Sequence, residues 1–180
     1  MSMVITVSGK AQAGKDSFAI LAKEMLESVG KTVCICHYGD YVKYVCKEYL
    51  GWDGVKDEAG RTMLQYEGTD YVRRRVPDFW INVILAFVNV YKERFDYFLV
   101  PDTRFPDEIE CYNRIPMIWS KCVRVIRTDC ENTLTEEQRA HISEIALDNY
   151  EFDAVISSES GLDKLRVEVQ KFVEELLSNE

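Results

Sequence analysis

Residues 9–17 read Gly-Lys-Ala-Gln-Ala-Gly-Lys-Asp-Ser, and this stretch decides the fold that we expect. A short apolar, β-branched run precedes it at 3–7, and apolar residues recur at helical spacing over 17–29. Strand, glycine loop and helix in this order are the arrangement of a phosphate-binding loop. The glycines let successive backbone N–H groups turn inward, the start of the helix adds partial positive charge, and Lys15 can reach the terminal phosphates of a nucleotide. A capped strand-to-helix turn is the alternative, but such a turn does not need the Gly-x4-Gly-Lys spacing.

The residue after the loop lysine departs from the common motif. That position usually carries Ser or Thr for Mg²⁺, whereas here it is Asp16, and the first hydroxyl belongs to Ser17. Either side chain could take the metal-side role, directly or through water, so both stay open. The Ser17 side chain could instead cap the helix expected at 17–29 or pack against its neighbours.

Strand-like and helical segments alternate along the rest of the chain. Strands are expected at 3–7, 32–36, 97–100, 122–127 and 154–156. Helices are expected at 17–29, 40–50, 79–94, 105–114 and 162–177, with a polar, partly helical stretch at 57–76 and a polar, turn-like stretch at 128–142. No repeat or linker interrupts this order. It predicts one α/β domain over 1–180, with three layers and a five-stranded, mostly parallel sheet.

A carboxylate and a guanidinium follow the strand expected at 97–100. Asp102 comes at its carboxyl end, the edge where ligands bind in open α/β sheets, and suits Mg²⁺ or a water of the metal. Arg104 could neutralise charge on a transferring phosphoryl group. A surface turn with a local ion pair is the alternative for Asp-x-Arg alone. A phosphate-binding loop in the same sheet favours the functional interpretation.

Composition excludes several classes of partner. The 180 residues carry 22 Lys and Arg against 31 Asp and Glu, a net charge of -9, which argues against nucleic acid. The longest apolar run, 79–91, is too short to span a membrane. The six cysteines form no CxxC pair and no secretory leader precedes them, so we expect reduced thiols in a cytoplasmic protein. A small anionic ligand would need only a local basic pocket. The run 73–75, Arg-Arg-Arg, could offer one or two side chains to it.

Five stretches together resemble one family. GKAQAGKDS, YGDYVK, LQYEGTDYVRRRVPDFW, DYFLVPDTRFPDEIE and HISE look like the phage-type deoxynucleoside monophosphate kinases, a branch of the P-loop nucleotide kinases, over nearly the whole chain. The phosphate loop and Asp-Thr-Arg are also similar to animal-type phosphomevalonate kinases. The middle block at 65–80 favours the nucleotide kinases, in which this region lies over the acceptor nucleotide.

The resemblance implies an activity and a set of site residues. The activity is transfer of the γ-phosphoryl group of ATP to a (deoxy)nucleoside monophosphate, with Mg²⁺. The acceptor-binding segment would be about 40–80 and a short lid about 127–142. The implied catalytic residues are Lys15, Asp102 and Arg104, and the metal-side residues are Asp16, Ser17 and Asp102. The implied ATP-binding residues are Gly9, Ala11, Ala13, Gly14, Lys15, Asp16 and Ser17. The implied acceptor-binding residues are Asp40, Lys43, Gln65, Thr69, Arg73 and Trp80.

Several alternatives stay open. A phosphomevalonate kinase-like phosphotransferase and an ATP-binding module without turnover compete with the nucleotide kinase, whereas a GTPase is disfavoured because no Asn-Lys-x-Asp motif occurs. Lys43 could be a solvated helix lysine, and Trp80 a core aromatic. His141 and its neighbours resemble a motif after the lid, although a helix cap would use the same residues. The base and sugar of the acceptor, and a homodimer, are left open.

Overall fold

A computed structural model describes residues 2–129, 134–159 and 161–179 of the chain. Its sheet has five parallel strands in the order β2-β3-β1-β4-β5. The strands are β1 (Ser2–Ser8), β2 (Val33–Ile35), β3 (Tyr97–Val100), β4 (Ile118–Arg127) and β5 (Ala154–Ser158). The expected five-stranded sheet is therefore confirmed, and every pairing in it is parallel.

Helices connect the strands. They are α1 (Lys15–Ser28), α2 (Gly39–Tyr49), α3 (Glu58–Gln65), the π-helix η1 (Tyr66–Arg73), α4 (Phe79–Tyr91), α5 (Pro106–Glu110), the 3-10 helix η2 (Cys111–Arg114), α6 (Glu136–Ala140), α7 (Ile142–Ile145) and α8 (Leu162–Ser178). Within the described ranges no helix is long and apolar enough to cross a membrane.

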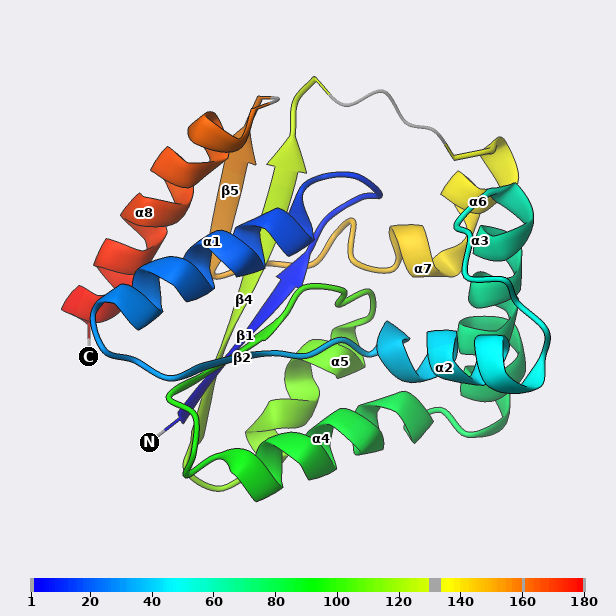
Figure 1. Ribbon diagram of the computed structural model, residues 1–180, viewed down its shortest axis with the longest axis horizontal. Helices are drawn as coiled ribbons and strands as arrows, with labels where there is room; N and C mark the ends of the chain where they lie inside the picture. The colour runs from blue at the N-terminus through cyan, green and yellow to red at the C-terminus, as the bar shows by residue number, and fades with distance from the viewer. Residues whose placement is uncertain (1, 130–133, 160, 180) are drawn as a thin grey trace.

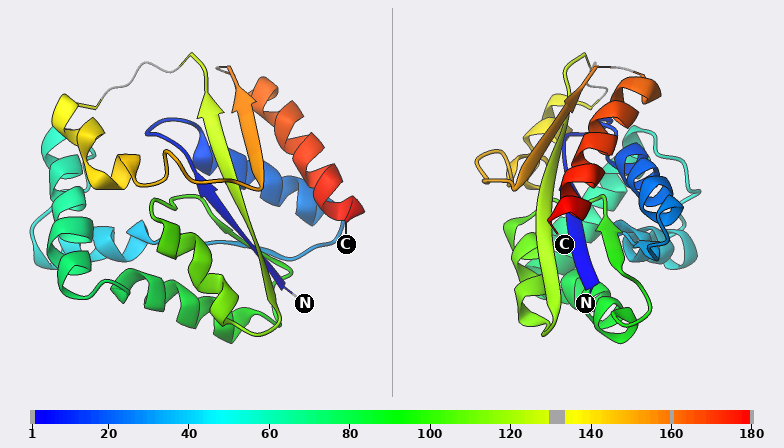
Figure 2. Two further views of the ribbon diagram at one scale, coloured as in Figure 1. Left: turned by 180° about the vertical axis from the view of Figure 1, so that it is seen from behind. Right: turned by 90° about the vertical axis from the view of Figure 1, so that its left-hand side faces the viewer.

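The sheet forms the middle of three layers. Helices α1 and α8 cover one face, and α4 and α5 cover the other, as the two views of Figure 2 show. Side chains alternate along each strand, so Ile5 and Leu99 pack under α1 and α8 while Val4 and Phe98 pack under α4. Because both faces are covered, β3 is apolar throughout and β1 is buried along nearly its whole length, although it carries Ser2, Thr6 and Ser8. This arrangement confirms the predicted three-layer α/β fold.

Two central strands deliver the chemistry to one edge of the sheet. β1 pairs in parallel with β3, with Ile5 opposite Leu99, so both strands end at the same edge. The phosphate-loop residues follow β1 and Asp102 follows β3. Helices α2, α3, α6 and α7 gather beyond this edge, on the right of Figure 1. The topology therefore brings the glycine loop, the end of β3 and the 39–73 segment together.

Three local predictions need correction. β4 begins at Ile118 rather than at 122, because it pairs with the full length of β1 from Ser2 onward. The stretch at 57–76 is helical almost throughout, and its second half is a π-helix. The stretch at 128–142 contains α6, which begins with a capping box: Thr135 Oγ1 accepts the N–H of Gln138, and the Gln138 side chain accepts the N–H of Thr135.

Residues 130–133 of the expected lid lie outside the described residues, and so does Cys130. The other cysteines are free thiols, namely Cys34, Cys36, Cys46, Cys111 and Cys122.

Candidate active site

The glycine loop needs its two glycines for different reasons. A Cβ on Gly9 would lie 2.5 Å from the carbonyl oxygen of Val125, so the loop can cross the neighbouring strand only without a side chain there. Gly14 has φ 93 and opens α1 in the left-handed conformation. The first N–H that bonds inside the helix is that of Phe18, to the Gly14 carbonyl at 2.8 Å. The preceding N–H groups of the helix have no intrahelical acceptor, so an anion at this N-terminus would be stabilised by them.

Lys15 folds back over the loop. Its Nζ donates to the carbonyl of Gly9 at 2.8 Å and to the carbonyl of Lys10 at 2.9 Å. Burial, with the nearby charge of Arg104 acting in the same direction, lowers the pKa of this ammonium to about 8, against the charges of Glu144, Asp16 and Asp102. A buried cation of this kind is favourable for an incoming phosphate.

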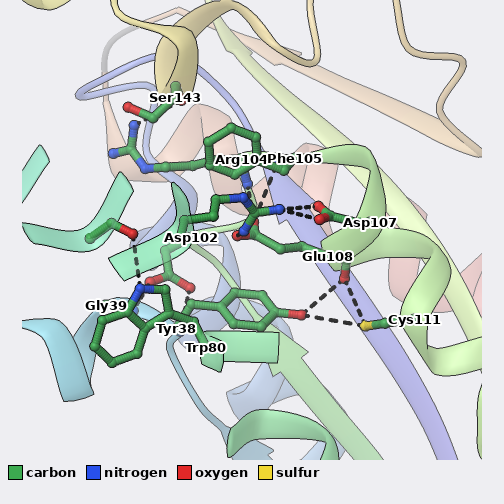
Figure 3. Close-up of polar contacts among 12 residues, drawn as sticks. Tyr38, Gly39, Trp80, Asp102, Arg104, Phe105, Asp107, Glu108, Cys111 and Ser143 are labelled. Carbon is green, nitrogen blue, oxygen red and sulfur yellow. Dashed lines mark hydrogen bonds and ion pairs between the residues drawn. The ribbon is translucent and has the colours of Figure 1, made fainter. Parts of the chain in front are cut away.

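Asp102 joins the end of β3 to the start of α2. Its Oδ1 accepts the N–H of Tyr38 at 3.0 Å, and its Oδ2 accepts the N–H of Gly39 at 2.7 Å (Figure 3). A carboxylate at a helix N-terminus is stabilised by the helix dipole. In this structure Asp102 therefore caps α2, a contact that the sequence did not predict, while it also faces the cavity described below.

Asp16 is paired with a histidine at the end of β2. His37 Nε2 lies 2.9 Å from Asp16 Oδ1, and His37 Nδ1 lies 3.3 Å from Asp40 Oδ2. The hydrogen bond from His37 lowers the pKa of Asp16, and the same bond raises the pKa of His37. Asp40 also pairs with Lys43 Nζ at 2.7 Å. The Asp16 side chain is 75% exposed, so its second oxygen faces solvent.

Arg104 is held by α7. Its Nη1 donates to the carbonyl of Ser143 at 3.1 Å and to the carboxylate of Glu144. The phosphate loop reaches the same helix, since Lys10 Nζ donates to the carbonyl of Glu144 at 2.7 Å and pairs with Asp148. The motif at 141–144 thus contacts both the phosphate loop and the guanidinium of Arg104. His141 also caps α7 by accepting the N–H of Ser143, which is the alternative that the sequence left open.

Arg73 has carboxylate partners of its own. Its guanidinium pairs with Asp107 and with Glu108, the latter at 3.0 Å, and its Cζ lies 3.9 Å above the ring of Phe105. The side chain is only 12% exposed. The sequence predicted an arginine for a substrate phosphate at this position but did not predict these acidic partners.

One cavity of about 300 Å³ collects most of the expected site residues. Those that line it are Ala11, Lys15, Asp16, Lys43, Gln65, Thr69, Arg73, Trp80, Asp102 and Arg104. Those outside its lining are Gly9, Ala13, Gly14, Ser17 and Asp40. Trp80 is a core aromatic, the alternative considered for it: it lies in α4 within a buried cluster, and its Nε1 donates to the carbonyl of Gly68 at 2.9 Å.

The cavity also contains charged residues that sequence reasoning missed. They are His37, Lys56, Arg61, Glu108 and Glu144. Lys43, Arg73 and Arg104 form ion pairs with acids, whereas Lys56 and Arg61 take part in none within the part of the chain that the structure describes. Burial lowers the pKa of Lys56, and the charges of Lys43 and Arg61 add to that effect. The clustered cations favour an anionic ligand. The polar character of the stretch at 57–76 was a sequence signal for Arg61 alone, since Lys56 lies just before that stretch.

The expected metal-side residues do not form a ready cation site. No cluster of three or more acidic, histidine or cysteine side chains with metal-binding geometry occurs among the described residues. Asp16 and Asp102 nevertheless border the same cavity, and Asp16 has an oxygen open to solvent. Two carboxylates beside nucleotide phosphates fit Mg²⁺, which usually takes few protein ligands and keeps several waters. Ser17 lies outside the lining of the cavity.

Comparison with known proteins agrees with the geometry. A family model described as deoxynucleotide monophosphate kinase matches residues 40–169. Dephospho-CoA kinase from Campylobacter jejuni has a similar structure, with 13% identity, a TM-score of 0.54 and 96% of each chain covered. Shikimate kinase from Acinetobacter baumannii in complex with shikimate has 12% identity and a TM-score of 0.51, covering 100% of this chain and 95% of that one.

A third structure is the Mycobacterium tuberculosis APS kinase CysC in complex with AMPPNP and APS. It has 16% identity and a TM-score of 0.51, with 96% of this chain and 98% of that chain covered. At these identities the similarity concerns the fold. No protein with a curated description matches the chain.

Proposed function

The chain belongs to the deoxynucleotide monophosphate kinase family, and from this premise we propose that it transfers the γ-phosphoryl group of ATP to a (deoxy)nucleoside monophosphate. The observation that carries the proposal is the shared cavity. Lys15 of the phosphate loop and Arg104 after β3 line it from the sheet, and the 39–73 segment closes it with further cations. We propose that the phosphates of donor and acceptor meet in this cavity.

The donor side is the glycine loop. The N–H groups at the start of α1 would bind the β- and γ-phosphates of ATP, and Lys15 would leave its carbonyl partners for the γ-phosphate. Asp16 and Asp102 would hold Mg²⁺, directly or through its waters. When bound, this ion neutralises phosphate charge and orients the γ-phosphoryl group.

The acceptor side is the wall formed by α2, α3 and η1. Lys56 and Arg61, which form no ion pair within the described residues, are the cations best suited to the acceptor phosphate, with Lys43 beside them. Gln65 and Thr69 offer hydrogen bonds to the nucleoside from the same wall. We place Arg73 and Trp80 on this side as well.

The chemical step follows from these positions. A phosphate oxygen of the acceptor forms a bond to the γ-phosphorus while the bond between that phosphorus and the β,γ-bridging oxygen breaks, which releases ADP. Lys15 and Arg104 stabilise the negative charge spread over the transferring group. Positioning supplies most of the catalysis in such a transfer.

The test is a coupled assay for ADP formation with a panel of ribo- and deoxyribonucleoside monophosphates. Phosphomevalonate belongs in the panel, because turnover with it alone would assign the phosphotransferase alternative. ATP binding without ADP formation from any acceptor would assign a binding module. Turnover with at least one nucleoside monophosphate is the expected result.

The acceptor wall is tested by charge removal. Lys56→Ala and Arg61→Ala should each raise KM for the monophosphate by about tenfold, while KM for ATP stays within about twofold. Arg74→Ala is the matched control, since Arg74 is 79% exposed and lies outside the cavity lining. Unchanged acceptor KM in both cavity variants would remove Lys56 and Arg61 from the phosphate site.

A further inference from the structure

The buried carboxylate of Glu108 binds two separate segments of the site. Its Oε1 accepts Nη1 of Arg73 at 3.0 Å, and its Oε2 accepts the backbone N–H groups of Arg104 at 2.7 Å and of Phe105 at 3.2 Å. The Glu108 side chain is 6% exposed. Burial raises the pKa of this carboxyl to about 7, against the effect of the N–H of Arg104 and the charge of Arg73. Keeping a carboxylate here is therefore costly for folding.

A helix cap explains only part of this arrangement. Glu108 is the third residue of α5, and its bond to the N–H of Phe105 is the usual capping-box contact, which Gln makes equally well. The cap explains neither the contact with Arg73, which comes from η1, nor the need for a negative charge. A charged carboxylate is needed to hold a guanidinium, such as that of Arg73, in a buried environment of low dielectric constant.

Both partners of Glu108 line the cavity. Arg73 is held from three directions, by Glu108, by Asp107 and by the ring of Phe105. Figure 3 labels these three partners. Arg104 is held at its backbone by Glu108 and at its guanidinium by α7. Three bonds use part of the five donors of the Arg73 guanidinium, so the remaining N–H groups can face the cavity.

We propose that Glu108 is a positioning residue, whose single carboxylate holds the Arg73 guanidinium and the Arg104 backbone at a constant separation on the cavity wall. The two arginines come from η1 and from the loop after β3, which are far apart in the chain. A common partner is the shortest way to align Arg73 on the acceptor side with Arg104 beside the transferring group. Displacements of about 1 Å cost roughly a hundredfold in such reactions. This inference rests on the proposed phosphoryl transfer at this cavity.

The main test is Glu108→Gln. The amide oxygen can still accept the N–H groups of residues 104 and 105, but the amide NH₂ then faces Arg73 and cannot bind it. We expect kcat/KM for the monophosphate to fall by about tenfold or more, with a lower kcat, while KM for ATP stays within about twofold. Glu110→Gln is the matched control on α5, because Glu110 is exposed, and it should retain wild-type constants.

A double-mutant cycle separates positioning from simple support of the fold. If Glu108 acts through Arg73, the loss caused by Glu108→Gln should shrink to about threefold or less in an Arg73→Met background. Full additivity of the two losses would overturn the proposal. Thermal unfolding is measured in parallel: a lower Tm with wild-type kinetic constants below that temperature would make Glu108 structural only.

Two further outcomes keep the tests distinct. If Glu108→Gln does not fold, Arg73→Met alone tests the inference, because it removes the partner of Glu108 and leaves the cap of α5 intact. Wild-type kcat and KM for the monophosphate in Arg73→Met would overturn the inference. Absence of turnover by the wild-type protein with every monophosphate would instead refute the proposed function. Normal wild-type turnover together with an unaffected Glu108→Gln variant would refute only the role of Glu108.

Discussion

The Asp102 carboxylate accepts the backbone N–H of Gly39 at 2.7 Å and so links the end of β3 to the start of α2. A Cβ on Gly39 would lie 3.1 Å from the same oxygen, so glycine lets the carboxylate approach the helix this closely. Together with the bond from the N–H of Tyr38, this contact joins the donor side of the cavity to its acceptor wall. Any change at Asp102 should affect both the proposed metal side and the acceptor helix.

Asp102→Asn should raise the Mg²⁺ concentration that gives half-maximal rate, because an amide is a weaker ligand than a carboxylate. It should also lower the free energy of unfolding by about 1 kcal/mol, the typical cost of a weakened helix cap. Metal titration of the rate and denaturant unfolding measure the two effects. An unchanged metal titration beside reduced stability would move the metal-side role to Asp16.

Lys15→Met should lower kcat by roughly a hundredfold or more, since it removes a preorganised donor to the transferring group. Circular dichroism should show an intact fold, because the hydrogen bonds of Lys15 Nζ to the carbonyls of Gly9 and Lys10 lie within the loop itself. Lys47→Met is the control, as Lys47 is an exposed lysine on α2. Near-normal turnover of the Lys15 variant would reject this site.

The pKa of about 8 for Lys15 predicts a pH limit on ATP use. The ammonium is protonated below that pH and loses its charge above it, so kcat/KM for ATP should fall as pH rises through about 8. Lys15→Arg keeps the positive charge at all accessible pH values, so its kcat/KM for ATP should not fall above pH 8, even if its rate is lower. A fall of kcat/KM above pH 8 in that variant would assign the pH dependence to another group.

Glu108 should make stability pH-dependent in the unusual direction for an acid. Its folded pKa, about 7, lies above the ordinary value of 4.5, so its contribution to stability is complete below about 4.5 and is lost as pH rises through 7. The total loss is of order 3 kcal/mol. Denaturant unfolding at pH 5 and pH 8 should differ less in Glu108→Gln than in the wild type. Equal pH dependence in the two proteins would contradict the raised pKa.

The donor half of the site could be predicted because it is local in the chain. Residues 9–17 are contiguous, and Asp102 and Arg104 follow directly after an apolar strand, so strand direction alone places them at the carboxyl edge of the sheet. The family resemblance was confirmed by the match over residues 40–169. The site roles of these residues stay predictions that the proposed variants test.

The acceptor wall could not be predicted in the same way. In the sequence Lys56 and Arg61 look like ordinary surface residues; Arg61 on α3 and Lys56 just before that helix line the cavity only in the folded chain. The π-helix η1 is equally hidden, because the period of the hydrogen bonds along the backbone, rather than any motif, distinguishes it from an α-helix.

The alternating α/β fold, the parallel sheet and the glycine loop could be predicted because they depend on periodicity and on backbone freedom over a few neighbouring residues. The pairing of charges could not be predicted in this way. Arg73 meets Glu108 across 35 positions, and Asp102 meets Gly39 across 63. Whether a charge is neutralised depends on distance and burial in space, and these are set by how η1, α2 and α5 pack around the end of β3.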